Sequence, residues 1–372
     1  MKEATLLSIP YPVDELVEGM ILDEGVYGGT DSRVPLVPKN AVLTRYQIDK
    51  LLKNDVHTVK VKQAPTGSGL IEIPKESPVI SARLRNETVT YLSDLFAVAQ
   101  GKFEDAALAS KTIRQLDNVV NQLVASLSQE GRSLIDINDL KSYDEYTYHH
   151  SLSVSVVSIA IAQYLGFSNR GLTQIGKCAL MHDIGKTKIP LEIINKKSKL
   201  DDDEFEVIKN HPPEGYRYLS ERSIGDEEIW EGVLYHHEKI DGTGYPMGLM
   251  GEDIPIMSRI ISVADVYDAL TSVRPYRNPM QPADAMEYIM GGATSAFDFD
   301  VVAAFMQKIQ PYPVGSMVEL SDGRICTVLD NDFTLRPVVQ ALDNGELLDL
   351  ANERACLELV IVNMFMETAN SV

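Results

Sequence analysis

The chain has 372 residues, 44% of them hydrophobic and 24% charged, a composition typical of a globular protein with room for two or three domains. Its net charge of −20 argues against nonspecific nucleic-acid binding, which depends on Lys and Arg neutralising phosphates. No long apolar run predicts a membrane span, the start of the chain does not resemble a secretory signal, and the three cysteines lie far apart. We therefore expect a soluble, cytoplasmic protein with reduced thiols.

The first 130 residues predict a small domain, a linker and a helical connector. Residues 1–66 alternate short apolar segments with turn residues around a helix-like segment that Thr44 can cap, and VHTVKVK has the alternation of a strand. This pattern predicts a small α+β domain. Residues 67–80 contain Pro, Gly and Ser and indicate a linker. Over 81–130 apolar residues recur every three or four positions, which predicts helices.

Residues 131–310 have a helical pattern nearly throughout. We expect helices over 146–165, 171–182, 226–238, 258–272 and 282–290, and another that Asp201 opens as its N-cap. From residue 311 onward, SMVELSDGRICTVLD predicts two strands around an Asp-Gly turn, and CLELVIVNMF predicts another strand. The predicted fold is mainly α, with a helical bundle over 131–310, the small N-terminal α+β domain and a short β-rich segment over 311–372.

Histidine and aspartate gather in the predicted bundle. Six of the seven histidines lie between His149 and His237, and two His-containing dyads stand inside HDIGK and HHEKIDGTGYP. Neutral imidazole and ionised carboxylate are the usual ligands of Fe, Mn, Zn and Ni. Because the side chains of neighbouring residues on a helix point about 100° apart, such dyads suit two metals better than one. The candidate ligands, which helices of a bundle can aim at one interior point, are His150, His182, Asp183, His211, His236, His237 and Asp265.

The reaction class follows from this ligand set. Asp183 is the natural bridging carboxylate, because each of its oxygens can hold one ion. A binuclear centre supplies a nucleophile for phosphodiester hydrolysis without a serine or cysteine, and no nucleophile motif of either kind is present. An anionic substrate would need local cations in so acidic a chain, and the candidates are Lys186, Lys188, Arg274 and Arg277. His57 and His149 are interpreted as structural.

Five sequence blocks resemble the HD-GYP family in family order: YTYHHS, HDIGK, HPPEG, HHEKIDGTGYP and RIISVADVYDALTSVRPYR. This family is a branch of the HD metal-dependent phosphohydrolases, known as bacterial cyclic di-GMP phosphodiesterases. The resemblance runs from about Asp144 to Phe305, close to half of the chain. Residues 1–66 also resemble the small domain often found ahead of HD-GYP domains.

The resemblance implies an HD-type bundle in which the seven candidates bind metal and a metal-bridging hydroxide opens cyclic di-GMP to linear pGpG. Whether a second step continues to GMP stays open. It implies that Asp183 and Lys186 are catalytic, that Lys186 contacts the scissile phosphate, and that Tyr245, Arg274 and Arg277 hold the rest of the dinucleotide. Tyr146 stands where some family members carry a Glu that holds a third metal. We therefore expect two divalent transition metals, with Fe or Mn favoured over Zn or Ni.

Two other functions stay open. The substrate can be 3′,3′-cyclic GMP-AMP or another nucleotide, since guanine and adenine differ only in their exocyclic groups. Alternatively, the fold can serve as a non-catalytic cyclic-dinucleotide sensor or docking module, although the complete ligand set argues against it. The sequence also leaves open a homodimer, the role of the N-terminal domain, and docking of a diguanylate cyclase or another signalling partner through that domain or the GYP loop.

Overall fold

The computed structural model describes residues 7–17, 20–27, 35–39, 41–54, 56–63, 79–102, 106–128, 146–194, 196, 198–272, 279–331 and 335–365. The chain divides into two compact units. One contains the N- and C-terminal parts, 1–77 and 310–372 with 129–133, and the other contains 78–128 and 134–309. Among the described helices, none has the length and apolar character needed to cross a membrane.

The N-terminal part forms the predicted small α+β fold. Its antiparallel sheet has the order β1-β3-β2, with β1 over Leu7–Pro12, β2 over Ile21–Leu22 and β3 over Thr58–Gln63. Helix α1 (Arg45–Lys53) begins after Thr44, whose side chain accepts a hydrogen bond from the Gln47 backbone in a capping box. Val59 and Val61 alternate inward from β3 onto a core that α1 completes with Ile48 and Leu51.

The C-terminal part is a five-stranded antiparallel sheet in the order β7-β6-β5-β4-β8. Its strands are β4 (Met317–Leu320), β5 (Ile325–Asp330), β6 (Val338–Ala341), β7 (Leu347–Asp349) and β8 (Ile361–Phe365). The β4–β5 hairpin turns at Asp322-Gly323, as predicted, and Gly323 has φ +85°. The strand predicted to begin at Cys356 begins at Ile361, because the carbonyls of Cys356 and Leu359 accept hydrogen bonds from the Arg336 guanidinium.

The second unit is helical, as predicted. Five of its helices begin at a Ser or Asp N-cap, among them α7 at the predicted Asp201. A turn follows α9, so this helix ends at Leu234 rather than at the predicted residue 238. The helices are α2 (Ala82–Ala99), α3 (Ala106–Leu127), α4 (Tyr146–Tyr164), α5 (Asn169–Met181), α6 (Leu191–Ile194), α7 (Asp202–Ile208), α8 (His211–Glu221), α9 (Glu227–Leu234), α10 (Ile256–Thr271), α11 (Pro282–Gly291) and α12 (Phe299–Lys308), with 3-10 turns η3 (Ile184–Lys188) and η4 (Gly251–Asp253).

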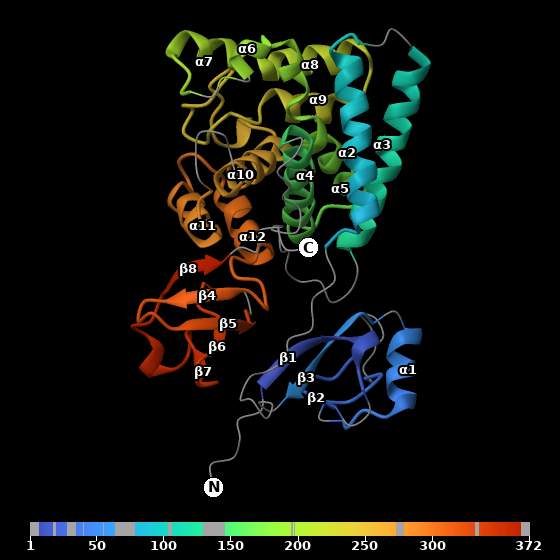
Figure 1. Ribbon diagram of the computed structural model, residues 1–372. Helices are drawn as coiled ribbons and strands as arrows, with labels where there is room; N and C mark the ends of the chain where they lie inside the picture. Colours follow the sequence, from blue (N-terminus) through green and yellow to red (C-terminus); the bar gives the residue numbers. More distant parts are fainter. Residues whose placement is uncertain are drawn as a thin grey trace. The chain divides into compact units, whose positions relative to one another are not determined.

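Helix α4 is the centre of this unit (Figure 1). Every residue from Ser151 to Ala162 is buried, so this part of the helix has no solvent face. Helices α2, α5, α10 and α12 pack around it. Gly176 allows α5 to approach closely, since a Cβ there would meet Val120 and Ile159 at 3.0 Å or less. Because His150 lies in the first turns of this central helix, its imidazole is carried into the interior.

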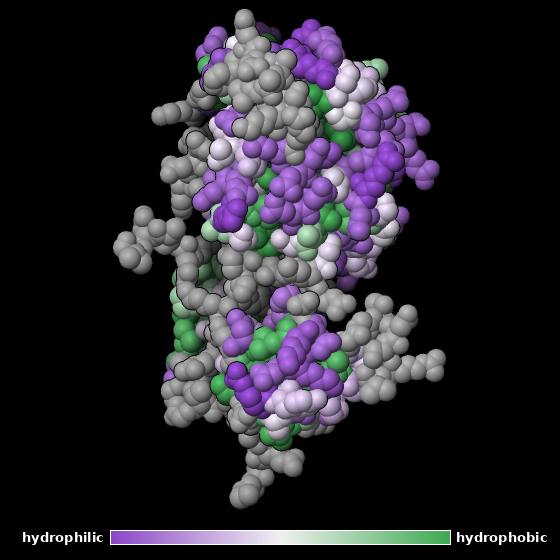
Figure 2. Space-filling view, turned by 90° about the vertical axis from the view of Figure 1, so that its right-hand side faces the viewer, coloured by the Kyte–Doolittle hydropathy of each residue, from purple (hydrophilic) through white to green (hydrophobic). Residues whose placement is uncertain are grey.

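Among the residues coloured in Figure 2, polar side chains predominate on the side of the helical unit that carries α2 and α3. Hydrophobic residues show there only as patches between them. The large apolar side chains of α2, such as Leu92, Leu95 and Phe96, are buried in the core shared with α4 and α5. The two helices predicted as a connector therefore pack into the same core as the histidine-bearing helices.

Candidate metal centre

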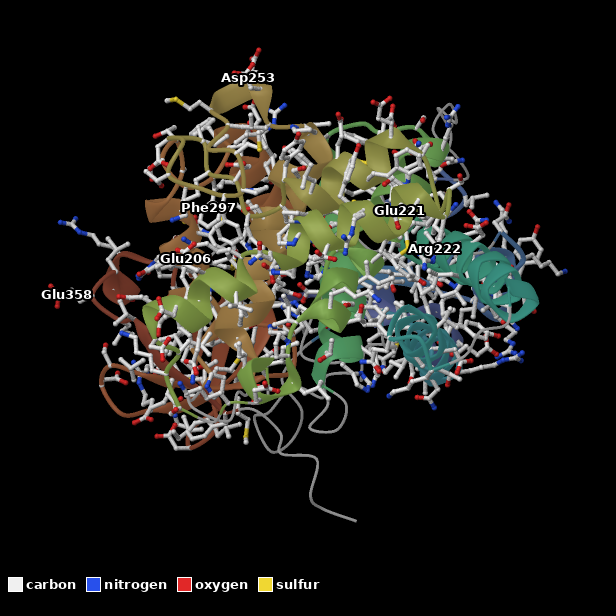
Figure 3. The ribbon with its side chains drawn as sticks, turned by 90° about the horizontal axis from the view of Figure 1, so that it is seen from above. Glu206, Glu221, Arg222, Asp253, Phe297 and Glu358 are labelled. Atoms are coloured by element: carbon white, nitrogen blue, oxygen red, sulfur yellow. The ribbon has the colours of Figure 1, made fainter. Side chains whose placement is uncertain are left out.

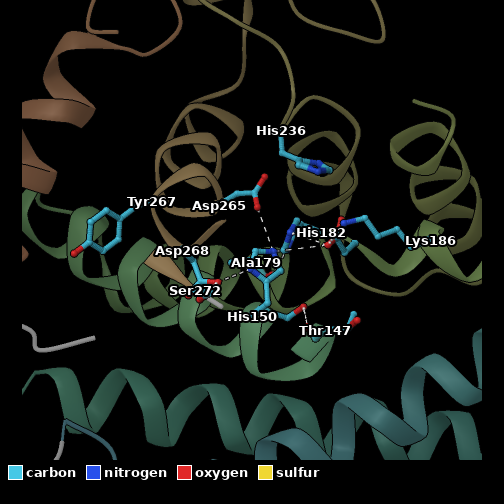
Figure 4. Close-up of polar contacts among 12 residues, drawn as sticks. Thr147, His150, Ala179, His182, Lys186, His236, Asp265, Tyr267, Asp268 and Ser272 are labelled. Atoms are coloured by element: carbon cyan, nitrogen blue, oxygen red, sulfur yellow. Dashed lines mark hydrogen bonds and ion pairs between the residues drawn. The ribbon is translucent and has the colours of Figure 1, made fainter. Parts of the chain in front are cut away.

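The structure gathers all seven candidate ligands in the interior of the helical unit. Figure 4 shows His150, His182, His236 and Asp265 among them. His150, His182 and Asp183 form one triad and His211, His236 and His237 another, and within each triad the ligand atoms lie within 4.8 Å of one another. Asp183 links the two triads, since its Oδ1 lies 3.3 Å from His211 Nε2 and its Oδ2 lies 3.4 Å from His182 Nε2. The seventh candidate joins the first triad, because Asp265 Oδ1 lies 3.2 Å from His150 Nε2. We call these seven residues the ligand cluster.

Helix ends fix the orientation of three of the imidazoles. His182 follows α5, His211 follows α7 and His236 follows α9, and the last carbonyls of a helix have no partner inside it. Each ring uses one of them: Nδ1 lies 2.7 to 2.8 Å from the carbonyl oxygen three residues earlier, that of Ala179, Ile208 or Val233. A carbonyl only accepts, so Nδ1 carries the proton and the neutral ring presents an unprotonated Nε2 to the cluster.

His150 is oriented by a carboxylate instead. Its Nδ1 lies 2.7 Å from Asp268 Oδ2, and Asp268 is 1% exposed and also accepts a hydrogen bond from Ser272. A carboxylate behind a ligating imidazole fixes its ring and strengthens it as a ligand. Sequence reasoning missed Asp268. The available signal was its spacing, three residues after Asp265 on α10, which puts both carboxylates on one helix face.

Burial and charge set the protonation states of the cluster. Burial lowers the pKa of His211 to about 3 and that of His237 to about 4, so both rings are neutral near pH 7. His150 differs: burial lowers its pKa, but hydrogen bonds to Asp265 and Asp268 outweigh burial and raise it to about 9. Burial would raise the pKa of the Asp183 carboxyl, yet Lys186 and the surrounding imidazoles hold it well below its usual range. The cluster thus combines ionised carboxylates with mostly neutral imidazoles, the forms that bind cations.

Several acceptor atoms of the cluster have no donor among the described residues. His182 Nε2 and Asp183 Oδ1 are buried and have no hydrogen-bond partner among the described residues. His211 Nε2 and His236 Nε2 face one another at 3.3 Å although both rings carry their proton on Nδ1. Unpaired buried acceptors are costly and rare. The residues present therefore fit metal ions, consistent with the metal dependence of HD-domain phosphohydrolases.

Among the described residues, Lys186 is a cation that lies beside the cluster. It lies on η3, its Nζ donates to Asp183 Oδ2 at 2.5 Å, and its side chain keeps 35% exposure. Gly185 brings η3 against the start of α8, because a Cβ there would collide with the His211 carbonyl and the Gly215 backbone. Lys188 does not serve as a second cation at the cluster. Its Nζ donates instead to the Ala99 carbonyl at the end of α2, 2.7 Å away.

The GYP loop, residues 241–249, packs Tyr245 against the cluster. The Tyr245 ring stacks on His237 with centroids 4.8 Å apart, and its backbone N–H donates to the His237 carbonyl. Gly244 is required at this point, since a Cβ would collide with the backbone of Glu238. Burial raises the pKa of Tyr245, and the carboxylates of the cluster raise it further, so its hydroxyl stays protonated.

A buried carboxylate that sequence reasoning missed holds this loop. Glu238 is 2% exposed, and its two oxygens accept backbone hydrogen bonds from Met247, Gly248 and Leu249 at 2.7, 3.0 and 3.1 Å. It follows directly on the His236-His237 dyad. Two metal-ligand candidates and the residue that holds the GYP loop beside them are therefore consecutive in the chain. An acidic residue beside two histidines was the only signal, and it did not distinguish a further ligand from a loop anchor.

Three predicted positions are not covered by this description. Arg274 and Arg277 lie outside the described residues, and so does the side chain of Tyr146. Of the histidines interpreted as structural, His57 precedes β3 in the N-terminal part. His149 precedes His150 on α4 and belongs to neither triad.

The chain is similar to several known proteins. A family model described as HD domain matches residues 132–301. The cyclic di-GMP phosphodiesterase PA4108 of Pseudomonas aeruginosa is 35% identical over 273 residues, which cover 73% of this chain and 63% of that protein. The 3′3′-cGAMP-specific phosphodiesterase 1 of Vibrio cholerae is 35% identical over 179 residues, which cover 47% of this chain and 41% of that protein. Among solved structures, Bd1817, a HDG"Y"P protein from Bdellovibrio bacteriovorus, matches with a TM-score of 0.48 and 16% identity, covering 80% of this chain and 98% of that one.

The chain spans less than two thirds of the length of either curated relative. The matched HD region contains the whole ligand cluster, from His150 to Asp265. Its sequence blocks stand in the order of the HD-GYP motif set, and the GYP loop lies against His237. The chain therefore carries an HD domain of the HD-GYP type.

Proposed function

We propose that this chain is a metal-dependent cyclic dinucleotide phosphodiesterase that hydrolyses cyclic di-GMP to linear pGpG. The observation that carries the proposal is the pair of buried triads joined by Asp183, with unpaired acceptors turned inward and Lys186 beside them. The name of the Pseudomonas aeruginosa relative supports the same substrate.

Two divalent cations suit this arrangement. Asp183 has one oxygen near each triad, so it would bridge them, while His150, His182 and Asp265 would hold one ion and His211, His236 and His237 the other. Bound there, the metals would supply Lewis-acid activation of water and of the phosphoryl group. Fe or Mn suits the mixed nitrogen and oxygen ligands, with Zn or Ni as alternatives.

The chain's own residues would bind and orient the substrate. Lys186, partly exposed and beside Asp183, would donate to an oxygen of the scissile phosphate and stabilise the charge that develops there. The protonated hydroxyl of Tyr245 can donate to the sugar-phosphate backbone, because its ring is held against His237. Asp268 keeps the His150 ring in place during the reaction. Contacts of Arg274 and Arg277 with the rest of the dinucleotide remain a prediction from the resemblance.

A second substrate has a specific observation in its favour. One relative at 35% identity is named as specific for 3′3′-cGAMP. That molecule presents the same phosphodiester linkages to a metal site, and only one base differs. The two substrates therefore share the ligand cluster and would be separated by contacts to the base edges.

The test is anaerobic hydrolysis by protein loaded with Mn or Fe(II), with the metal content measured on the same sample. Cyclic di-GMP and 3′,3′-cyclic GMP-AMP are supplied at equal concentration, and Asp183→Asn serves as the control. We expect about two metals per chain and linear pGpG as the first product. If cyclic GMP-AMP is hydrolysed faster, it replaces cyclic di-GMP as the proposed substrate. Full metal occupancy with binding but no hydrolysis of either dinucleotide would overturn the enzyme in favour of a sensor.

A further inference from the structure

We propose that Phe205 forms a stacking subsite for a nucleobase of the cyclic dinucleotide, at the outer side of Tyr245. The inference rests on the proposed function and adds the binding surface for the part of the substrate that does not react. Phe205 lies on α7, a short helix whose last carbonyl, that of Ile208, accepts the hydrogen bond from His211. In Figure 3, the label of Glu206 marks the position of this helix.

A row of aromatic rings leads from the ligand cluster to Phe205. The first contact is the stack of Tyr245 on His237, with centroids 4.8 Å apart and planes 28° apart. The second is an edge contact between Phe205 and Tyr245, with centroids 6.5 Å apart and planes 81° apart. Phe205 is thus two ring contacts from a metal-ligand candidate. A phosphate held at the cluster would have its attached nucleoside beside these rings.

Phe205 is also available to a ligand. It is 45% exposed, and none of the residues of α7 is fully buried, so the core does not explain the aromatic side chain. A single exposed apolar residue is common on protein surfaces and by itself indicates nothing. Its contact with Tyr245, whose ring is packed on the cluster, is what separates Phe205 from the other exposed hydrophobic residues.

A cation completes this surface. Lys209 Nζ lies 5.0 Å from the centroid of the Phe205 ring and 5.8 Å from that of Tyr245, so one ammonium group contacts both rings. Glu206 holds it there through an ion pair of 2.5 Å. Charge and aromatic surface thus occur together, as they do in sites that bind single-stranded nucleotides.

The chemistry of stacking limits what this subsite can select. Every nucleobase has a π-face, so a phenylalanine contributes to affinity without distinguishing guanine from adenine. The subsite would hold cyclic di-GMP and cyclic GMP-AMP alike. Contacts to base edges elsewhere would then decide between them.

The test compares four forms of the metal-loaded protein: wild type, Phe205→Ala, Phe205→Trp and the control Phe299→Ala. Phe299 is a more exposed phenylalanine, 63% against 45%, at the start of α12. The probes are cyclic di-GMP, for which KM is measured, and inorganic phosphate, whose Ki is measured against cyclic di-GMP hydrolysis. Stacking is worth about 1–3 kcal/mol per base, so Phe205→Ala should raise KM roughly 5- to 150-fold. The Ki of phosphate should be the same for Phe205→Ala and wild type, because phosphate has no ring to stack.

The remaining variants make the result specific. Phe205→Trp should keep KM within about threefold of wild type, and Phe299→Ala should leave it unchanged, since stacking needs a ring at 205 only. Equal KM values for Phe205→Ala and wild type, or parallel losses in KM and phosphate Ki, would overturn the subsite. A wild type that binds cyclic di-GMP without hydrolysing it would overturn the proposed function alone. Calorimetric Kd values for the same four proteins would then test Phe205.

Discussion

Replacing Glu238 with Ala should detach the GYP loop from the helical unit. The substitution removes an acceptor from the backbone N–H groups of Met247, Gly248 and Leu249. Hydrogen bonds to a charged group are worth about 1.5–3 kcal/mol each. Because the loop can open and give these N–H groups to water, we expect the free energy of unfolding to fall by about 3 kcal/mol rather than by the full sum.

Glu238→Gln is the matched variant. Its amide oxygen can keep the bonds from Met247 and Gly248, while its NH₂ group would meet the N–H of Leu249. We therefore expect a loss of about 1–2 kcal/mol, between wild type and Glu238→Ala. Both values come from denaturant unfolding of the metal-loaded protein, and hydrogen exchange reports the three amides directly. Unchanged protection of these amides in Glu238→Ala would refute the reasoning. If the free energy of unfolding were also unchanged, Glu238 would have no structural role.

Four further predictions follow from the ligand cluster. Asp183→Ala should abolish both turnover and metal loading, because this carboxylate faces both triads; full activity would contradict the binuclear arrangement. Lys186→Met should keep the metals, counted by elemental analysis, while kcat falls by about 10²- to 10³-fold, as for loss of one preorganised donor. Asp268→Ala should weaken metal binding by about 10- to 100-fold in chelator competition, with Asp268→Asn in between. In the metal-free protein, the pKa of His211 is about 3 and that of His237 about 4, both lowered by burial, while unfolded imidazoles protonate near pH 6.5. The unfolded chain then binds more protons, so the free energy of unfolding should fall as the pH drops from about 6.5 to about 4, and a flat profile over that range would contradict it.

The sequence predicted the elements well wherever local signals act. Thr44 and Asp201 cap helices as predicted, because their side chains accept from backbone N–H groups of the first turn. The Asp-Gly turn of the β4–β5 hairpin also lies where it was expected. The strand after Cys356 was predicted to begin too early, because a distant side chain, Arg336, takes the carbonyls that a sheet would use. Tertiary contacts of this kind leave no periodic pattern in the sequence.

The ligand types were predictable because imidazole and carboxylate side chains gathered in this way suit metal binding better than any purely structural role. Their supporting residues were not. Asp268 and Glu238 differ from surface carboxylates only in what they contact, a ring nitrogen 118 residues earlier in one case and three backbone N–H groups in the other. Neither contact has a fixed spacing in sequence. Supporting carboxylates of this kind therefore become identifiable only once the fold is known.

The helix ends connect the fold to the chemistry. His182, His211 and His236 each come three residues after a carbonyl in the last turn of a helix, and each donates Nδ1–H to that carbonyl. One local arrangement, used three times, sets the tautomer, aims Nε2 inward and brings the negative end of a helix dipole to a site for cations. A histidine in the middle of a helix would find that carbonyl already bonded to an N–H of its own helix. Helices α5, α7 and α9 must therefore stop where these three histidines stand. The predicted extension of α9 to residue 238 would have removed the Val233 carbonyl from His236.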